Sequence, residues 1–180
     1  MQTWTFSGNS LHILEGDITR ADTRAIVNAA NPRLAGGGGV DGAIQRAAGP
    51  KLLLTGQDLV RVHGMVSPGD AVITPAFDLP HDYVIHAVGP IWNGGENNEA
   101  RLLESAYTVS LLLARAHNIP SLAFPAISCG AYGYPVEQAA PIALRTLAEG
   151  LEEGLVQSVQ LILHGADACH HWQEQARKLL

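Results

Sequence analysis

Polar residues that could take part in chemistry lie on both sides of a glycine run in the first quarter of the chain. Asn28 and Asn31 precede the glycines Gly36–Gly39, and Asp41 follows them. Glycine lets the backbone adopt positive φ and approach a ligand closely, and free N–H groups at a helix start attract anions. The stretch 28–48 therefore predicts an anion-binding loop with amide and carboxylate side chains beside it.

A second glycine-bearing loop, Ile127–Pro135, also lies between a predicted strand and a predicted helix. Two such loops could close on one ligand from opposite sides. A single phosphate needs one loop, whereas a diphosphate can fill both. Tyr132, in the middle of the second loop, has a ring that could cover a sugar; the alternative is ordinary packing of an aromatic ring over the turn.

Strands and helices alternate along the chain and must position these loops. The predicted strands are 3–6, 11–14, 25–27, 70–75, 83–88, 121–126 and 158–163. Helical spacing predicts helices over 40–48 and 51–62, a helix capped by Asn98, one whose first turn holds Pro135, and a closing helix 168–180. Pro141 should kink the fourth of these or delay its start. We expect a single α/β domain over residues 1–180, with a sheet sandwiched between helices.

The glycines also admit a dinucleotide-binding interpretation, because Gly37, Gly39 and Gly42 satisfy the pattern GxGxxG. That fold needs the loop directly after the strand and an acidic residue at the end of a second strand about 20 residues later. Here six residues separate strand and loop, residues 51–62 predict a helix, and Asp41 would repel a pyrophosphate. We therefore disfavour a dehydrogenase.

Four other groups of residues could be functional. Asp17 follows the end of a predicted strand. Its carboxylate could bind a ligand or cap the next segment, and the sequence leaves both roles open. His86, inside an apolar run, is typical of a core histidine. Cys129 has no partner histidine that would favour a nucleophile. The run Cys169–His171 cannot form a metal site alone, because adjacent helical residues project in different directions.

Bulk properties narrow the function further. The chain has 180 residues, 47% of them hydrophobic and 16% charged, with a formal net charge of −6. This composition indicates a globular protein, and the charge argues against direct nucleic-acid binding. Two cysteines give no disulfide framework. No signal peptide and no apolar run of membrane-spanning length is apparent, so we expect a cytoplasmic protein that does not bind membranes.

Five motifs, in this order, resemble those of a macrodomain of the MacroD type: GDIT at 16–19, NAAN at 28–31, GGGGVDGAI at 36–44, HAVGPIW at 86–92 and AISCGAYGYP at 126–135. The resemblance implies a three-layer α/β/α sandwich with a mixed, mostly parallel sheet of six or seven strands. It also implies ADP-ribose as ligand. The MacroD-like branch removes ADP-ribose from acid-linked mono-ADP-ribosylated proteins and deacetylates O-acetyl-ADP-ribose. We expect neither a cofactor nor a metal.

The resemblance also implies roles for individual residues. Asn31 and Asp41 match the catalytic pair, and Asp17, with Ile18 beside it, matches the carboxylate that accepts the adenine amino group. Asn28 and Asn31 match asparagines near the distal ribose. The first diphosphate loop corresponds to Gly38, Gly39 and Val40, and the second to Ser128, Cys129, Gly130, Ala131, Tyr132 and Gly133, with Tyr132 against the distal ribose.

Two positions depart from the family pattern. Gln45 stands where many relatives have histidine one turn after the aspartate, which leaves the orientation of Asp41 open. Ala166 stands where many relatives place an aromatic ring over adenine. We expect a hydrolase in which Asp41 orients or deprotonates a water, alone or with a ligand phosphate, and Asn31 holds the ribose hydroxyl or the water. The alternative is a non-catalytic reader that only binds ADP-ribose.

Overall fold

The protein is described by a computed structural model that covers residues 1–180. Its seven strands are β1 (Gln2–Phe6), β2 (Asn9–Glu15), β3 (Ala25–Ala29), β4 (Ala71–Pro75), β5 (Tyr83–Ala87), β6 (Ser121–Phe124) and β7 (Ser158–Leu163). The helices are α1 (Gly39–Ala48), α2 (Pro50–His63), α3 (Glu99–Ala116), α4 (Val136–Glu152) and α5 (Ala166–Leu179), with a 3₁₀ turn η1 (Ile18–Arg20). Every predicted strand and helix is present, with ends that differ by a few residues.

The strands form one mixed sheet in the order β1-β2-β7-β6-β3-β5-β4. The strands β2, β7, β6, β3 and β5 are parallel, and the edge strands β1 and β4 each pair antiparallel with their neighbour. The sheet confirms the expected mixed, mostly parallel arrangement. Because the parallel strands point the same way, the loops that follow them leave from one edge of the sheet.

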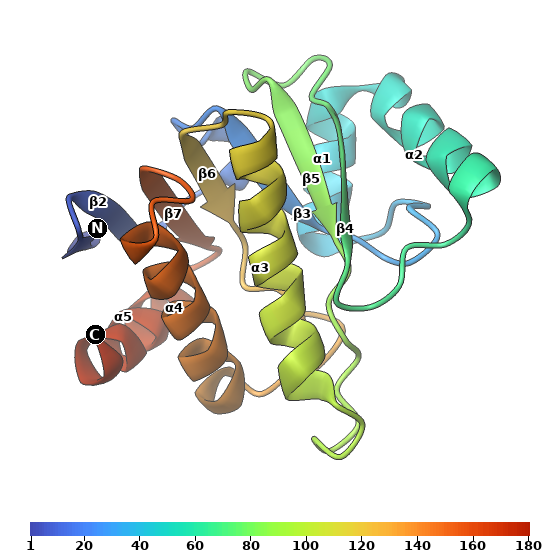
Figure 1. The fold of residues 1–180 in the computed structure, drawn as a ribbon. Helices are drawn as coiled ribbons and strands as arrows, with labels where there is room; N and C mark the ends of the chain where they lie inside the picture. The colour runs from blue at the N-terminus through green and yellow to red at the C-terminus, as the bar shows by residue number, and fades with distance from the viewer.

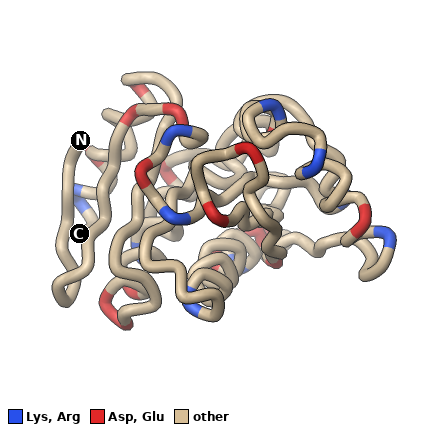
Figure 2. The backbone as a smooth tube through the Cα atoms, turned by 90° about the horizontal axis from the view of Figure 1, so that it is seen from above, with Lys and Arg blue, Asp and Glu red and all other residues tan.

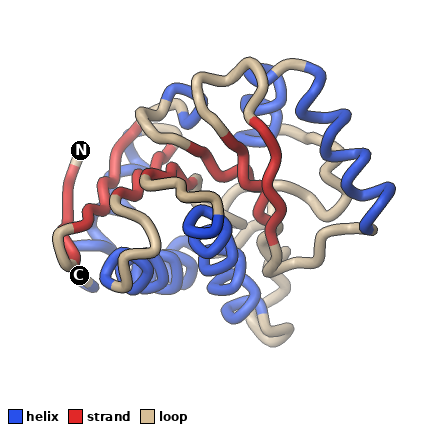
Figure 3. The backbone as a smooth tube through the Cα atoms, turned by 45° about the horizontal axis from the view of Figure 1, so that its top comes forward, coloured by secondary structure: helices blue, strands red, loops and turns tan.

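Helices cover both faces of the sheet, as the band of strands between helices in Figure 3 shows. On one face, α3 and α4 run side by side (Figure 1), and α5 packs against α4 and β2. On the other face, α1 packs against β3 and α2 against β4. The larger core lies beneath α3, α4 and α5, and a smaller one lies beneath α1, α2 and η1. These layers confirm the α/β/α sandwich.

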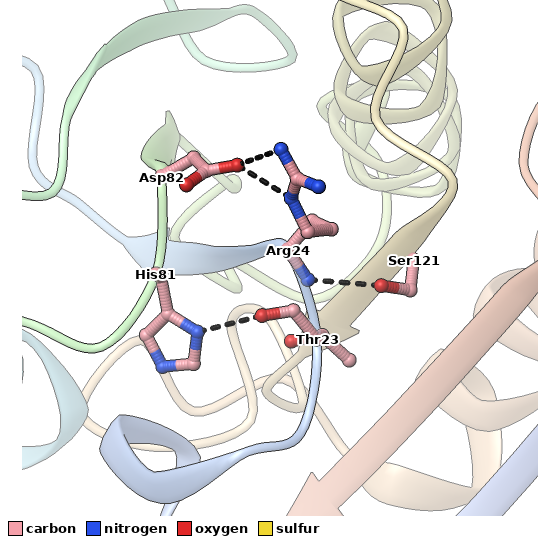
Figure 4. A network of polar contacts seen from close by, with 5 residues as sticks. All are labelled: Thr23, Arg24, His81, Asp82 and Ser121. Carbon is pink, nitrogen blue, oxygen red and sulfur yellow. Dashed lines mark hydrogen bonds and ion pairs between the residues drawn. The ribbon is translucent and has the colours of Figure 1, made fainter.

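Polar contacts align the starts of three neighbouring strands (Figure 4). The backbone nitrogen of Arg24 donates to Ser121 Oγ at 2.9 Å, and the Arg24 guanidinium pairs with Asp82. His81 Nδ1 lies 2.8 Å from the carbonyl oxygen of Thr23. The Arg24–Asp82 pair is solvent-exposed, so we expect it to add little to stability. Together these contacts hold the chain before β3 in register with the starts of β5 and β6.

The helix starts differ in detail from the predictions. Asn98 precedes α3 with φ of 60°, and its side chain makes no capping bond. Glu99 instead turns its carboxylate back to accept hydrogen bonds from the backbone nitrogens of Asn93, Gly95 and Asn97. Burial would raise the pKa of Glu99, but these donors outweigh it and the pKa is lowered. Glu99 thus fixes the loop before α3.

Helix α4 runs unbroken from Val136 to Glu152, with Pro135 as the residue before its first turn and Pro141 inside it. Of the two alternatives for Pro141, the later start is therefore wrong, and the kink stays a prediction. Pro141 lacks the N–H that would donate to the carbonyl oxygen of Glu137, yet the helix continues past it. None of the five helices is both long and apolar enough to cross a membrane.

Candidate functional site

A cleft of about 880 Å³ opens at the edge of the sheet where the parallel strands end. Its walls come from the segments that follow β2, β3 and β6, from the end of β7, and from the start of α1. Ligands of open α/β sheets bind at this carboxyl edge. The cleft is therefore the place where the residues predicted from the sequence should meet.

Most of the predicted site residues do meet there. The cleft is lined by Asp17, Ile18, Asn31, Gly38, Gly39, Val40, Asp41, Ser128, Cys129, Gly130, Ala131 and Tyr132. Gly133 and Asn28 lie outside the lining. Gly133 has φ of 70° and closes the second loop through its backbone nitrogen, which donates to the Gly130 carbonyl oxygen at 2.9 Å. Asn28 is 1% exposed and lies behind Asp41.

The first glycine loop leads directly into α1. Gly39, the first residue of the helix, has φ of 56°, a conformation that side chains other than glycine adopt at a cost. A Cβ atom on Gly42 would lie 2.6 Å from the Gly37 carbonyl oxygen, so the helix and the loop can touch only because residue 42 is glycine. The helix start has no side-chain cap. Its first N–H groups are thus left for an anion in the cleft.

Asn31 shapes the chain that leads into this loop. Its Oδ1 accepts hydrogen bonds from the backbone nitrogens of Arg33 and Ala35, and its Nδ2 donates to the Gly36 carbonyl oxygen at 2.9 Å. An amide nitrogen carries two hydrogens, so one N–H of Asn31 remains for a ligand hydroxyl or a water.

The carboxylate of Asp41 is held by one of its two oxygens. Oδ1 accepts from Asn28 Nδ2 at 2.9 Å and from Gln45 Nε2 at 3.4 Å. Oδ2 makes no hydrogen bond within the chain and lies beside Gly37 in the first loop. Gln45 therefore lies within hydrogen-bond reach of Asp41 although it departs from the family pattern. One oxygen is anchored, and the other is available in the cleft.

A buried histidine stands behind this pair. His86 Nδ1 lies 3.3 Å from Asn28 Nδ2, and its Nε2 lies 2.9 Å from Thr74 Oγ1. Burial lowers the pKa of His86 to about 4, so the ring is neutral at physiological pH. The prediction of a core histidine with satisfied hydrogen bonds is confirmed, and its bonds lead to Asp41 through Asn28.

The second loop is braced from behind. Ser128 has φ of 65°, and its carbonyl oxygen accepts from the backbone nitrogen of Tyr134 at 2.9 Å. The backbone nitrogen of Trp92 donates to the Tyr132 carbonyl oxygen at 2.9 Å, and the Trp92 ring packs against Tyr134 with centroids 4.6 Å apart. Burial and the charge of Asp41 raise the pKa of Tyr132. Tyr132 and Asp41 line the same cleft, so the two loops face each other across it.

Of the two interpretations that the sequence left open for Asp17, the structure confirms the capping role, and the ligand role stays a prediction. Its Oδ1 accepts from the backbone nitrogen and the hydroxyl of Thr19, which caps η1. Those two hydrogen bonds lower the pKa of Asp17 against an opposing effect of burial. The side chain is exposed in the cleft, and Oδ2 has no partner within the chain. One carboxylate can thus cap the turn and accept from a ligand.

The cysteines and histidines singled out from the sequence do not form a reactive cluster. Burial raises the pKa of the Cys129 thiol to about 12, which keeps it protonated. Cys169 is buried, whereas His170 pairs with Glu174 and His171 with Glu137. No three His, Cys, Asp or Glu side chains lie close enough together to hold a metal ion.

Sequence reasoning missed several residues of the cleft wall, notably Arg46, His164 and Trp172. Arg46 follows Gly42 by one helical turn, and that spacing could have placed it beside the glycine loop. Ala166 does not line the cleft; Ala168 and Trp172 of α5 form that wall. Lys and Arg are scattered along the backbone (Figure 2), and Arg46 is the only one of them among the residues that line the cleft, which also include Asp17 and Asp41. We therefore expect loop amides to dominate anion binding.

A family model, a sequence relative and two solved structures are all similar to this chain and agree on its family. Residues 27–143 match the family described as Macro domain. A protein from Citrobacter rodentium named O-acetyl-ADP-ribose deacetylase is 59% identical over 139 residues, covering 77% of this chain and 78% of that protein. An Oceanobacillus iheyensis macrodomain solved with ADP has a TM-score of 0.95 and 41% identity, covering 99% of this chain and 95% of that chain. A Trypanosoma brucei macrodomain in complex with ADP-ribose has a TM-score of 0.79 and 34% identity, covering 94% and 67%.

Proposed function

The chain belongs to the macrodomain family, and we propose that it is a hydrolase of ADP-ribose esters. Bacterial relatives named for the deacetylation of O-acetyl-ADP-ribose support deacetylase activity in this chain. We further propose that the same site removes ADP-ribose from acid-linked mono-ADP-ribosylated proteins. Both substrates join an acyl group to ribose through an ester, so one catalytic arrangement can serve both.

The observation that carries this proposal is the placement of Asp41. Its carboxylate stands at the start of α1 beside the anion-binding loop and is 6% exposed. A carboxylate there weakens the attraction for an anionic ligand, because it opposes the positive end of the helix dipole. One oxygen is nevertheless anchored by Asn28 and Gln45 while the other is free. A chemical role explains this arrangement, whereas a role in binding alone does not.

The ligand would be held along the cleft by groups already described. Asp17 Oδ2 would accept from the adenine amino group, with Ile18 beside the base. Amides of Gly38, Gly39 and Val40 and of Ser128–Gly133 would surround the diphosphate from both sides. Tyr132 would lie against the distal ribose, close to Asp41.

Hydrolysis needs no covalent intermediate on the protein. Asp41 Oδ2 accepts a proton from a water, alone or with a ligand phosphate oxygen, as the water oxygen bonds to the ester carbonyl carbon. The bond from that carbon to the ribose oxygen then breaks, and the ribose oxygen takes the proton. The free N–H of Asn31 holds the ribose hydroxyl or the water. The products are ADP-ribose and acetate, or ADP-ribose and a restored side-chain carboxylic acid.

The chemistry calls on no metal or organic cofactor, and the proposed partners are ADP-ribose, O-acetyl-ADP-ribose and ADP-ribosylated proteins. A cytoplasmic location and the lack of direct nucleic-acid binding stay predictions from the sequence.

Two parallel incubations test the proposal, one with O-acetyl-ADP-ribose and one with a protein that carries mono-ADP-ribose on acidic side chains. Released ADP-ribose and acetate are quantified in the first, and loss of label with release of ADP-ribose in the second. Release in both supports the full proposal. Release in the first alone limits the chain to deacetylation. Tight ADP-ribose binding without release in either identifies a reader.

A further inference from the structure

A line of buried hydrogen bonds continues behind Asp41 into the sheet. From the carboxylate it passes through Asn28 on β3 and His86 on β5 to Thr74 on β4, with distances of 2.9, 3.3 and 2.9 Å. Asn28 and His86 are 1% exposed, and Thr74 is 3% exposed. Parallel register places Asn28 directly opposite His86. The proposed reaction uses neither His86 nor Thr74, so their alignment needs a separate explanation.

The direction of each hydrogen bond in this line follows from the carboxylate. An ionised carboxylate only accepts, so Asn28 must present its NH₂ group to Asp41 Oδ1. The second hydrogen of the same nitrogen then points to His86 Nδ1, which must be the unprotonated ring nitrogen. The ring proton therefore sits on Nε2 and is donated to Thr74 Oγ1. The Thr74 hydroxyl donates onward to the Pro75 carbonyl oxygen at 3.0 Å.

We propose that His86 is a positioning residue for Asp41, which it holds through the side-chain amide of Asn28. This inference rests on the proposed hydrolase function. A ring with a proton on Nδ1 would face the Asn28 NH₂ group with a donor and would turn the amide over. The Asn28 oxygen would then face Asp41 Oδ1, and two acceptors repel each other. Neutral His86 with its proton on Nε2 keeps Oδ1 anchored and Oδ2 free in the cleft.

The unpaired oxygens of the two amides support this role. Asn28 Oδ1 and Gln45 Oε1 are buried and have no hydrogen-bond partner within the chain. Leaving a buried acceptor unpaired costs free energy. Both amides nevertheless donate to the same oxygen of Asp41, Oδ1, while their own oxygens stay unpaired within the chain. The low pKa of His86 agrees, because the ring must stay neutral to accept from Asn28.

Two substitutions at residue 86 separate positioning from packing. His86→Leu fills the space of the ring but offers no acceptor, whereas His86→Asn leaves a cavity but can place an oxygen where Nδ1 stood. We expect kcat for ester hydrolysis to fall roughly 10–100-fold in His86→Leu, the range found when a supporting hydrogen bond is lost at metal sites. His86→Asn should keep most of kcat although it is the less stable of the two. Affinity for ADP-ribose should be unchanged in both.

Thr74 and Ser110 supply the matched variants. Thr74→Val removes the hydroxyl that accepts the Nε2 proton and should lower kcat. Thr74→Ser keeps that hydroxyl and should keep most of the wild-type kcat. Ser110→Ala deletes a buried hydroxyl of α3 on the other face of the sheet and should leave kcat unchanged. The Thr74 pair tests the same line if His86→Leu does not fold.

The readouts are kcat, calorimetric affinity, melting temperature and the Asn28 side-chain amide signals in an ¹H–¹⁵N NMR spectrum. The Asn28 signals should move in His86→Leu and stay in Ser110→Ala. Wild-type kcat in His86→Leu, or kcat losses that simply follow melting temperature across the variants, would overturn the inference. A wild type that releases no ADP-ribose overturns the hydrolase proposal instead, and unmoved Asn28 signals in His86→Leu would then overturn the positioning role separately.

Discussion

Gln45 Nε2 lies 3.4 Å from Asp41 Oδ1, one helical turn further along α1. The amide of Gln45 thereby supplies the second donor to the oxygen that Asn28 already holds. Because an amide does not titrate, Gln45 itself keeps the same donor over the pH range in which a histidine would change its charge. We therefore expect Gln45 to help orient Asp41 in this chain without a histidine at residue 45.

Gln45→Glu exchanges that donor for a carboxylate of nearly the same size. Two carboxylates at hydrogen-bond distance cannot both ionise freely, so the pair would share a proton and Asp41 would accept one from water less readily. We predict that kcat at pH 7 falls roughly tenfold or more, and further than in Gln45→Ala. Initial rates of the three proteins on O-acetyl-ADP-ribose check this. Equal rates for Gln45→Glu and the wild type would show that the contact has no influence.

Asp17 offers a way to separate capping from ligand recognition. Asparagine caps a helical turn about as well as aspartate but lacks the charge that the Thr19 hydrogen bonds favour, so Asp17→Asn should unfold only slightly below the wild-type temperature. It loses the charged acceptor for the ligand, and we predict an ADP-ribose affinity weaker by about 1.5–3 kcal/mol. Asp17→Ala should lose stability as well as affinity. Calorimetric titration with ADP-ribose and thermal unfolding make the comparison, and full affinity in Asp17→Asn would remove Asp17 from the ligand site.

Gly38 and Gly39 form a matched pair in the first loop. A Cβ atom at either position meets nothing within 4 Å, but only Gly39 has positive φ. We predict that Gly39→Ala lowers the free energy of unfolding by about 1–2 kcal/mol, whereas Gly38→Ala costs only about 0.5 kcal/mol or less. Gly39→Ala should also weaken ADP-ribose binding, because relief of the strain moves the first amides of α1. Urea unfolding and titration of both variants provide the test, and equal stabilities would refute the strain argument.

Cys129 lines the cleft, yet its thiol should not react. Its pKa near 12 keeps the thiol protonated over the whole working range, so no thiolate forms as the pH rises. We predict that Cys129→Ser keeps the wild-type kcat, that the rate shows no rise with a thiol titration below pH 10, and that EDTA has no effect. Loss of activity in EDTA with recovery on adding zinc would overturn the metal-free mechanism.

The strands, helices and both glycine loops could be predicted from the sequence because each depends on local patterns. Apolar runs specify strands such as β3, and helical spacing with glycine before it specifies α1. The sheet order could not be derived from those patterns, because the sequence of a buried strand does not indicate which other strand it pairs with. Its mixed, mostly parallel form came from the family resemblance.

The roles of Asn28 and His86 depended on contacts that no local pattern contains. The two residues are 58 positions apart and meet only because β3 and β5 pair in register. Asn28 therefore stands behind Asp41 rather than in the cleft wall. Glu99 illustrates the same limit. The sequence pattern favours Asn98 as the helix cap, but the Glu99 carboxylate accepts the hydrogen bonds from the backbone nitrogens of the preceding loop.

The central claim is that Asp41 acts in hydrolysis and not in binding, and the most direct test measures turnover and ADP-ribose affinity on the wild type and on Asp41→Ala. If Asp41 Oδ2 accepts the proton of the attacking water, kcat for O-acetyl-ADP-ribose should fall roughly 10²–10⁴-fold in the variant. Affinity should stay the same or tighten slightly, because a negative charge beside the diphosphate is gone. A variant that hydrolyses the ester at the wild-type rate would contradict the account.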